Sequence, residues 1–187
     1  MLIEAGANPA ETQQGRTALD LARAGKHQDV VQILEAAQAY LQGYQYYERG
    51  EYAKAADLFK QAAEQGNAVA AGTLGFMYMK GSGVPVDIPK AISNLTVSFD
   101  AGEPSAAYNL GDIYYYGKGG IKKDRTLASQ WYAKALAGHL ERAASGDLES
   151  ITIVGRMYSE GAGTKPNPTE ALKWLQQAVD RGYPMAQ

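Results

Sequence analysis

The stretch Leu74-Gly75-Phe76-Met77-Tyr78, followed by Gly81-Ser82-Gly83-Val84, decides the fold because the chain repeats it. Two further copies stand in the same order: Leu110-Gly111-Asp112-Ile113-Tyr114 with Gly117-Lys118-Gly119, and Val154-Gly155-Arg156-Met157-Tyr158 with Gly161-Ala162-Gly163-Thr164. Self-similarity at a spacing of tens of residues is typical of repeat proteins, in which each unit buries its apolar face against its neighbours. The sequence therefore predicts an array of similar units.

The shared glycine of each copy lies inside an apolar helical pattern. Gly75 and Gly111 are 36 residues apart, whereas Gly111 and Gly155 are 44 apart, so one unit contains an eight-residue insertion. A glycine inside a helix costs about 1 kcal/mol relative to alanine. Its recurrence predicts that a second helix approaches too closely for a side chain to fit.

A second helix is expected in each unit, after a loop that contains Pro or Asp. Ala91, Ile92, Leu95 and Phe99 keep helical spacing in one unit, and Ala171, Leu172, Leu175 and Val179 keep it in another. A unit is therefore helix, glycine loop, helix. The insertion of the third unit, Gly138-His139-Leu140-Glu141-Arg142, is expected to lengthen its second helix or to kink it at Gly138.

These units resemble Sel1-like repeats, which are longer-loop relatives of tetratricopeptide repeats. The residues that stand in that family's order are Ala71, Leu74, Gly75, Tyr78, Gly81, Gly83, Asp87, Lys90 and Ala91. An upstream unit resembles the tetratricopeptide pattern through Gly43, Tyr46, Gly50, Tyr52, Ala55, Phe59 and Ala62. The resemblance implies an all-α fold, a right-handed α-solenoid of antiparallel helix pairs.

The N-terminal segment is of a different kind. Gly15 to Ala22 and His27 to Leu34 resemble the last ankyrin repeat of an array, and Leu2 to Pro9 resembles the tail of the preceding repeat. Ala18, Asp20 and Lys26 depart from the ankyrin pattern. One ankyrin unit with half a neighbour cannot bury its own face, so we expect the chain to be a segment of a longer protein.

The expected organisation follows from these resemblances. Partial ankyrin repeats occupy residues 1–36, and Sel1-like or tetratricopeptide-like repeats occupy residues 37–187. The repeat units are about 38–66, 67–102, 103–146 and 147–182, and 183–187 begins a further unit. No Gly or Pro interrupts residues 28–42, so one continuous helix over about 28–49 is predicted to join the two parts.

Composition excludes several classes of protein. The chain has 187 residues, 45% of them hydrophobic, with 18 Lys and Arg against 20 Asp and Glu. The net charge of −2 is unlike the basic surface that nucleic-acid binding requires, so no nucleic-acid partner is expected. No apolar run approaches the roughly 20 residues that span a bilayer, so membrane insertion is not expected either.

No catalytic, metal or cofactor site is expected. The chain lacks Cys and contains two His. His27 stands at the ankyrin position where, by that resemblance, the imidazole braces a helix start, and we expect His139 to lie on a solvated face. Gly81-Ser82-Gly83 and Gly117-Lys118-Gly119-Gly120 follow helices instead of strands, which favours interhelical turns over phosphate loops. An enzyme is therefore not expected.

Tyrosine points to a binding surface. Ten of the 13 Tyr fall in first helices, and Tyr46, Tyr78, Tyr114 and Tyr158 share one packing position. By the tetratricopeptide resemblance, the first helices line an inward, concave groove. Counted from the shared glycine, its positions are Tyr40, Tyr44, Tyr47, Phe76, Met79, Lys80, Tyr108, Asp112, Tyr115, Tyr116, Thr152, Arg156, Ser159 and Glu160. The alternative is that several of these rings pack between helices.

The predicted function is a protein–protein interaction scaffold or adaptor that holds a peptide or a partner protein in this groove. A glycan or cell-wall binding module is one alternative, although Trp131 and Trp174 fall on second helices, away from the groove. A purely structural spacer is another. The first residues lack a positively charged region and have only a three-residue apolar stretch, so they are not expected to act as a signal peptide. A cytoplasmic adaptor and a secreted effector both fit, and the sequence fixes neither the partner nor the oligomeric state.

Overall fold

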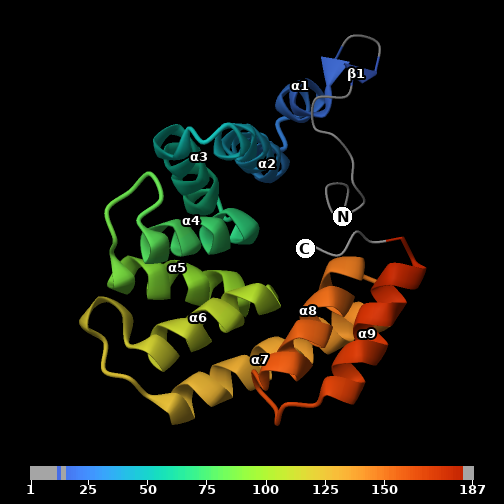
Figure 1. Cartoon of the computed structure of the whole chain (residues 1–187). Coiled ribbons are helices and arrows are strands. Elements are labelled where there is room, and N and C mark those ends of the chain that lie inside the picture. The colour runs from blue at the N-terminus through green and yellow to red at the C-terminus, as the bar shows by residue number, and fades with distance from the viewer. Residues whose placement is uncertain (1–11, 14–15, 183–187) are drawn as a thin grey trace. The chain divides into compact units, whose positions relative to one another are not determined.

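Consecutive helices joined by short links set the architecture. The computed structural model describes residues 12–13 and 16–182, which include α1 (Ala18–Ala24), α2 (Gln28–Glu48), α3 (Tyr52–Glu64), α4 (Ala68–Lys80), α5 (Ile88–Asp100), α6 (Pro104–Tyr116), α7 (Arg125–Ala144), α8 (Leu148–Glu160) and α9 (Pro168–Asp180). A 3₁₀ turn, η1, covers Lys118–Gly120. The expected all-α class is confirmed (Figure 1).

The described part of the N-terminus contains two short strands before α1. β1 (Thr12–Gln13) pairs antiparallel with β2 (Arg16–Thr17). The Thr17 side chain accepts a hydrogen bond from the Asp20 backbone N–H, and the Asp20 carboxylate accepts one from the Thr17 backbone N–H, so the two residues form a capping box for α1. The predicted stretch Leu2 to Pro9 lies outside the described residues.

Helix α2 is continuous over 21 residues, which confirms the helix predicted over 28–49. At its start it packs on α1, where Ala22, Val31 and Leu34 form a small buried cluster. Its later part contributes Ala39 to a second cluster with residues of α3 and α4, among them Phe59, Leu74 and Met77. One helix therefore takes part in two apolar cores.

The chain divides after Val97 into two compact units. Unit 1 contains α1 to α4 and most of α5. Unit 2, from Ser98 onward, contains α6 to α9 around a core that includes Leu136, Ile151, Val154 and Met157.

The repeated glycines mark close contacts between helices, as predicted. A Cβ on Gly75 would lie 2.8 Å from Leu95 Cγ, and one on Gly155 would lie 2.8 Å from Leu175 Cγ. Gly43 approaches Phe59 and Gly111 approaches Tyr132 in the same way, at 2.9 and 2.5 Å. Because these distances exclude a side chain, the glycines bring the first and second helices of each pair together.

The tyrosine that follows each helix glycine by three residues closes the loop through its backbone. The carbonyls of Tyr46, Tyr78, Tyr114 and Tyr158 accept the N–H of the residue just before the next helix, at 2.8 to 3.1 Å. In three units that residue also caps the helix with its side chain, and these caps are Asp87, Asp124 and Asn167. The recurring loop chemistry thus sets the turn.

The insertion of the third unit lengthens its second helix, which was one of the two predicted outcomes. Helix α7 has 20 residues, whereas α6, α8 and α9 have 13. Its added turns contact the start of α6. A Cβ on Gly138 would lie 2.8 Å from Pro104 Cβ, and Arg142 binds Glu103 at 3.0 Å and the Gly102 carbonyl at 2.7 Å.

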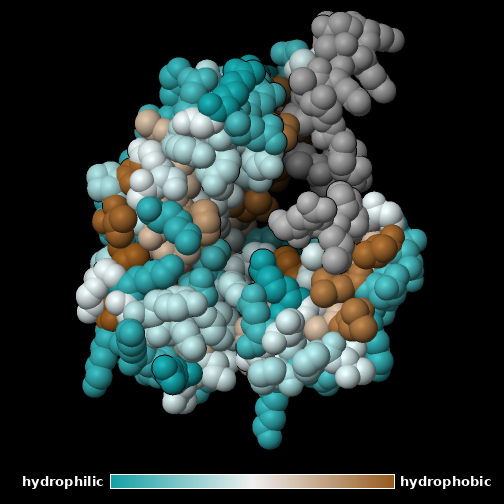
Figure 2. Space-filling model, in the orientation of Figure 1, coloured by the Kyte–Doolittle hydropathy of each residue, from teal (hydrophilic) through white to brown (hydrophobic). Residues whose placement is uncertain are grey.

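Apolar side chains show over α9 in Figure 2. The exposed apolar residues of α9 are Leu172 and Val179. At the position equivalent to Val179, Phe99 lies in edge contact with Trp131 of α7, with ring centroids 5.4 Å apart. Among the described residues, no helix follows α9 that could cover Val179 as α7 covers Phe99.

Candidate functional site

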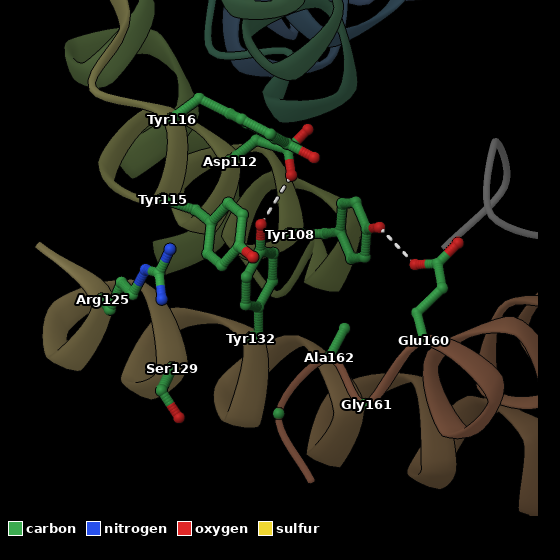
Figure 3. A pocket seen from close by; sticks show the side chains of 11 residues that line it. Tyr108, Asp112, Tyr115, Tyr116, Arg125, Ser129, Tyr132, Glu160, Gly161 and Ala162 are labelled. Atoms are coloured by element: carbon green, nitrogen blue, oxygen red, sulfur yellow. Dashed lines mark hydrogen bonds between the residues drawn. The ribbon is translucent and has the colours of Figure 1, made fainter. Parts of the chain in front are cut away.

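Unit 2 contains a cleft of about 330 Å³. It lies where α6 and the first half of α7 meet the loop that follows α8 (Figure 3). Four tyrosines supply its aromatic surface, and two carboxylates and one guanidinium supply its charge. The lining residues are Tyr108, Asp112, Tyr115, Tyr116, Arg125, Ser129, Tyr132, Glu160, Gly161, Ala162 and Gly163.

Tyr132 forms the floor of this cleft. Its ring packs on Gly111, where the units around Gly75 and Gly155 have leucine. The hydroxyl extends beyond that packing position and donates a 2.7 Å hydrogen bond to Asp112 Oδ1. Tyr132 is 9% exposed, so it acts as a core residue with a polar group directed to the cleft.

Tyr108 joins the cleft to α8. Its hydroxyl donates a 2.9 Å hydrogen bond to Glu160 Oε2, and its ring centroid lies 5.2 Å from that of Tyr132. The Arg156 guanidinium carbon lies 5.4 Å from the centroid of the Tyr108 ring, and Arg156 Nε lies 3.9 Å from Glu160 Oε1. Both carboxylates of the cleft are therefore already engaged by groups of the same unit.

Burial raises the pKa of both hydroxyls that bind these carboxylates. For Tyr132 desolvation raises the pKa first, and the hydrogen bond to Asp112 raises it further. For Tyr108 desolvation and then the hydrogen bond to Glu160 act in the same direction. The two phenols consequently stay protonated and keep donating at physiological pH.

Tyr115 and Tyr116 form the open side of the cleft. They are 40% and 56% exposed, and their ring centroids lie 4.9 Å apart in an edge arrangement. The Arg125 guanidinium carbon lies 5.6 Å from the Tyr115 centroid, and Lys118 Nζ lies 5.6 Å from that of Tyr116. Each exposed ring thus has a cation beside it.

The structure gathers five of the expected groove residues into this cleft: Tyr108, Asp112, Tyr115, Tyr116 and Glu160. Arg156 lies beside Tyr108 without lining the cleft. Thr152 bonds to the Leu148 carbonyl within its own helix, and Ser159 is exposed on α8. These residues come from α6 and α8, the helices expected to line the groove.

In unit 1 the expected positions divide into packed and open side chains. Tyr40 and Tyr47 are partly buried against the core, and their ring centroids lie 5.6 and 6.4 Å from that of Phe59. Met79 is 5% exposed and has little surface to offer a partner. Tyr44, at 46% exposed, and Lys80 are open, and Lys80 Nζ lies 5.6 Å from the half-buried Phe76 ring.

Sequence reasoning missed the contribution of α7, which adds Arg125, Ser129 and Tyr132 to the cleft. A signal for Tyr132 was present, because it occupies the position where Leu95 and Leu175 pack on their glycines. A tyrosine at a repeat's leucine position brings a hydroxyl that needs a partner.

The expectation that His139 lies on a solvated face is wrong. His139 is 2% exposed, with Nδ1 3.0 Å from Ser150 Oγ and Nε2 3.3 Å from Ser105 Oγ. Desolvation lowers the pKa of its imidazole to about 4, and the nearby Arg142 acts in the same direction. The ring is therefore a neutral link between α6, α7 and α8.

His27 immediately precedes α2 but caps it through no side-chain hydrogen bond. Within the described residues, no group of three or more His, Cys, Asp or Glu side chains could hold a metal ion. The same residues include no helix that is both long and apolar enough to cross a bilayer.

Four segments of the chain match the Sel1 repeat family: residues 34–67, 69–102, 104–139 and 149–183. Among solved structures, the chain is similar to c5321, a protective antigen of uropathogenic Escherichia coli with an SLR fold. The TM-score is 0.55 and the identity 29%, over 89% of this chain and 34% of that one.

Curated relatives carry varied names. An exopolysaccharide production negative regulator of Rhizobium leguminosarum bv. viciae is 28% identical over 77% of this chain and 56% of its own length. The alginate biosynthesis protein AlgK of Pseudomonas syringae is 32% identical over 60% and 22%, and the ERAD-associated E3 ubiquitin-protein ligase component HRD3A of Arabidopsis thaliana is 36% identical over 33% and 8%. The chain spans about half of the regulator and less of the others. Since the four repeat matches cover most of its residues, the chain belongs to the Sel1 repeat family.

Proposed function

We propose that this chain is a protein–protein interaction scaffold that binds a peptide or a partner protein on its tyrosine-rich surface. Sel1 repeat proteins typically mediate protein–protein interaction. The observation that carries the proposal here is the exposed pair of rings, Tyr115 and Tyr116, beside a cleft of about 330 Å³. Tyrosine and arginine at a preformed hollow are the residues that protein interfaces favour.

In unit 1 the proposed contacts are Tyr44 and Lys80, with Tyr40, Tyr47 and Phe76 as partly buried support. Tyr44 is 46% exposed, and its ring centroid lies 6.4 Å from that of Tyr40. A ring held by its neighbour loses little freedom when a partner covers it.

The test places a photo-crosslinking amino acid at Tyr116 and, in a second protein, at Tyr44. A matched control carries it at Gln177, which is exposed on α9 and does not line the cleft. We expect one partner to crosslink from Tyr116 and not from Gln177. The same partner should be lost from pull-downs with Tyr44→Ala/Tyr115→Ala/Tyr116→Ala, a variant that circular dichroism should show to be folded because all three side chains are exposed. Equal crosslinking of the partner from Gln177 would contradict the proposal that the tyrosine-rich surface is the binding site.

A glycan-binding role is a second candidate, favoured by the names of two relatives, which refer to exopolysaccharide production and alginate biosynthesis. Tyr115 and Tyr116 would then stack on sugar rings. Trp131 and Trp174 would not contribute to sugar stacking in the cleft, because both pack against the unit 2 core instead of lining the cleft. Quenching of tyrosine fluorescence by alginate oligosaccharides, abolished by Tyr115→Ala/Tyr116→Ala, would support it. A spacer would show neither a crosslink nor quenching.

The ankyrin resemblance of residues 1–36 remains part of the proposal. The order β1, β2, α1, α2 and the capping box at Thr17 are compatible with the end of an ankyrin array. If the resemblance holds, fusing two consensus ankyrin repeats before residue 1 should raise the protection of the α1 backbone amides, measured by hydrogen exchange. No added protection of α1 would count against it.

A further inference from the structure

The loop between α6 and α7 carries an unusual charge for this chain. Residues 117–125, here called the basic loop, contain Lys118, Lys122, Lys123 and Arg125 against one carboxylate, Asp124. The equivalent loops contain one carboxylate, Asp87, in residues 81–88 and one cation, Lys165, in residues 161–168. The repeat pattern therefore does not require this charge.

The cations of the basic loop have no carboxylate partners among the described residues. Asp124 uses its side chain to cap α7 through the Leu127 N–H at 2.8 Å. Arg125 and Lys118 lie over the rings of Tyr115 and Tyr116, and neither forms a salt bridge in the described part of the chain. Lys122 and Lys123 are exposed. The loop therefore offers two cations over exposed rings, Lys118 and Arg125, and two further exposed lysines.

Neither carboxylate of the cleft forms a salt bridge with a cation of the basic loop among the described residues. Asp112 accepts from Tyr132, and Glu160 accepts from Tyr108 and has Arg156 nearby. In Figure 3, Arg125 and Glu160 lie at opposite ends of the site, with the Tyr115, Tyr132 and Tyr108 rings between them. The Arg125 end is thus the positive end of the cleft, continuous with the basic loop.

We propose that this end of the cleft binds an acidic segment of the partner protein, a stretch with Asp or Glu side chains. One partner carboxylate pairs with the Arg125 guanidinium, which presents parallel N–H donors. Neighbouring acids lie along Lys122 and Lys123, and the chain between them packs on Tyr115 and Tyr116. This inference rests on the proposed function and names the chemistry of its partner.

Charge complementarity favours this occupant over nucleic acid. The whole chain has a net charge of −2, so the positive charge is local to one loop. A nucleic-acid site generally needs a wider basic surface. A peptide of a few acids matches the short extent of the loop, and the preformed rings suit its side chains.

The experiment titrates the full chain, labelled with ¹³C at tyrosine rings, with three dodecapeptides that differ only at four positions: Glu, Gln or Lys. We expect the Glu peptide to shift the Tyr115 and Tyr116 resonances saturably, with the Gln and Lys peptides at least about tenfold weaker. A single-stranded oligonucleotide and phosphatidylserine vesicles serve as competing anions. Shifts by either of these without shifts by the Glu peptide overturn the proposal.

The double variant Lys122→Gln/Lys123→Gln is compared with a matched control, Lys165→Gln/Arg181→Gln, because each removes two positive charges from unit 2. Lys122→Gln/Lys123→Gln should weaken Glu-peptide binding about fivefold, and Arg125→Gln alone about tenfold. Lys165→Gln/Arg181→Gln should change it less than about twofold. Equal losses in the two double variants would show a general charge effect and overturn the proposal.

The outcomes separate this inference from the proposed function. One outcome is a partner that crosslinks from Tyr116 and still binds Arg125→Gln and Lys122→Gln/Lys123→Gln with full affinity. That result would support the scaffold function and contradict the proposed acidic segment. Absence of any crosslinked partner, with the Glu peptide bound as expected, removes the scaffold function and leaves the anion-binding chemistry of the loop.

Discussion

The Tyr132 hydroxyl donates a 2.7 Å hydrogen bond to Asp112 Oδ1, and both residues depart from the repeat that contains them. Tyr132 stands where other units place Leu95 and Leu175 against a helix glycine. Asp112 follows its glycine directly, where the other three units have Tyr44, Phe76 and Arg156. Two departures joined by one bond turn an ordinary helix contact into the floor of a cleft.

Replacing Tyr132 with Phe should lower the free energy of unfolding by about 1 kcal/mol, because the lost hydrogen bond has a charged acceptor that water can reach in part. Urea unfolding followed by circular dichroism measures the change. Tyr115→Phe is the matched control, since the Tyr115 hydroxyl forms no hydrogen bond within the described residues, and its effect should be close to zero. Equal effects of the two variants would mean that the Asp112 bond contributes nothing.

Gly111→Ala should destabilise the chain by about 1 to 2 kcal/mol, although alanine is the better helix former. The added Cβ would lie 2.5 Å from Tyr132 Cε1, so the ring has to move. In a Tyr132→Ala background the clash is absent, and Gly111→Ala should become neutral or stabilising. A double-mutant cycle by urea unfolding gives the coupling. Equal costs in the two backgrounds would contradict the contact.

The helix pairs were predictable because glycine spacing carries packing information directly. Gly75 and Gly111 are 36 residues apart and Gly155 follows 44 residues later, each inside an apolar helix, and each lies against a second-helix side chain. The continuous helix α2 was predictable for a similar local reason, the absence of Gly and Pro from residues 28–42. Where the signal is local, sequence suffices.

The environment of His139 was not predictable, because it depends on contacts between distant residues. Ser105 and Ser150, its hydrogen-bond partners, are 34 residues before it and 11 after it. Ser105, His139 and Ser150 come together only because the added turns of α7 extend over the start of α6. The full lining of the cleft was not predictable either. Arg125 and Tyr132 line it from α7, a second helix, whereas the tetratricopeptide resemblance predicts a groove lined by first helices.

Gly163→Ala should cost more than Gly120→Ala. Both residues have positive φ, at 79° and 82°, so alanine is strained by about 1 kcal/mol at either position. At Gly163, however, the Cβ would also lie 2.5 Å from the Tyr132 carbonyl oxygen, whereas nothing lies within 4 Å of a Cβ on Gly120. We expect a total loss of about 3 kcal/mol or more at Gly163, measured by urea unfolding. Similar losses at both positions would show that the loop does not need to contact α7.

The stability of unit 2 should fall as the pH is lowered through the range below 6.5, because His139 is neutral in the folded state. Its folded pKa of about 4 lies below the ordinary value of 6.5, so the unfolded chain binds the proton first. Stability from this group is therefore complete above pH 6.5 and decreases toward pH 4.

At pH 4.5 the loss attributable to His139 should be about 2 kcal/mol relative to pH 7.5, measured by urea unfolding at both values. Carboxylates also titrate in this range, so the quantity that matters is the difference between the natural chain and His139→Gln. The amide can still bond to Ser105 or Ser150 but takes up no proton. If His139→Gln loses as much stability as the natural chain between the two pH values, the buried imidazole is not the group responsible.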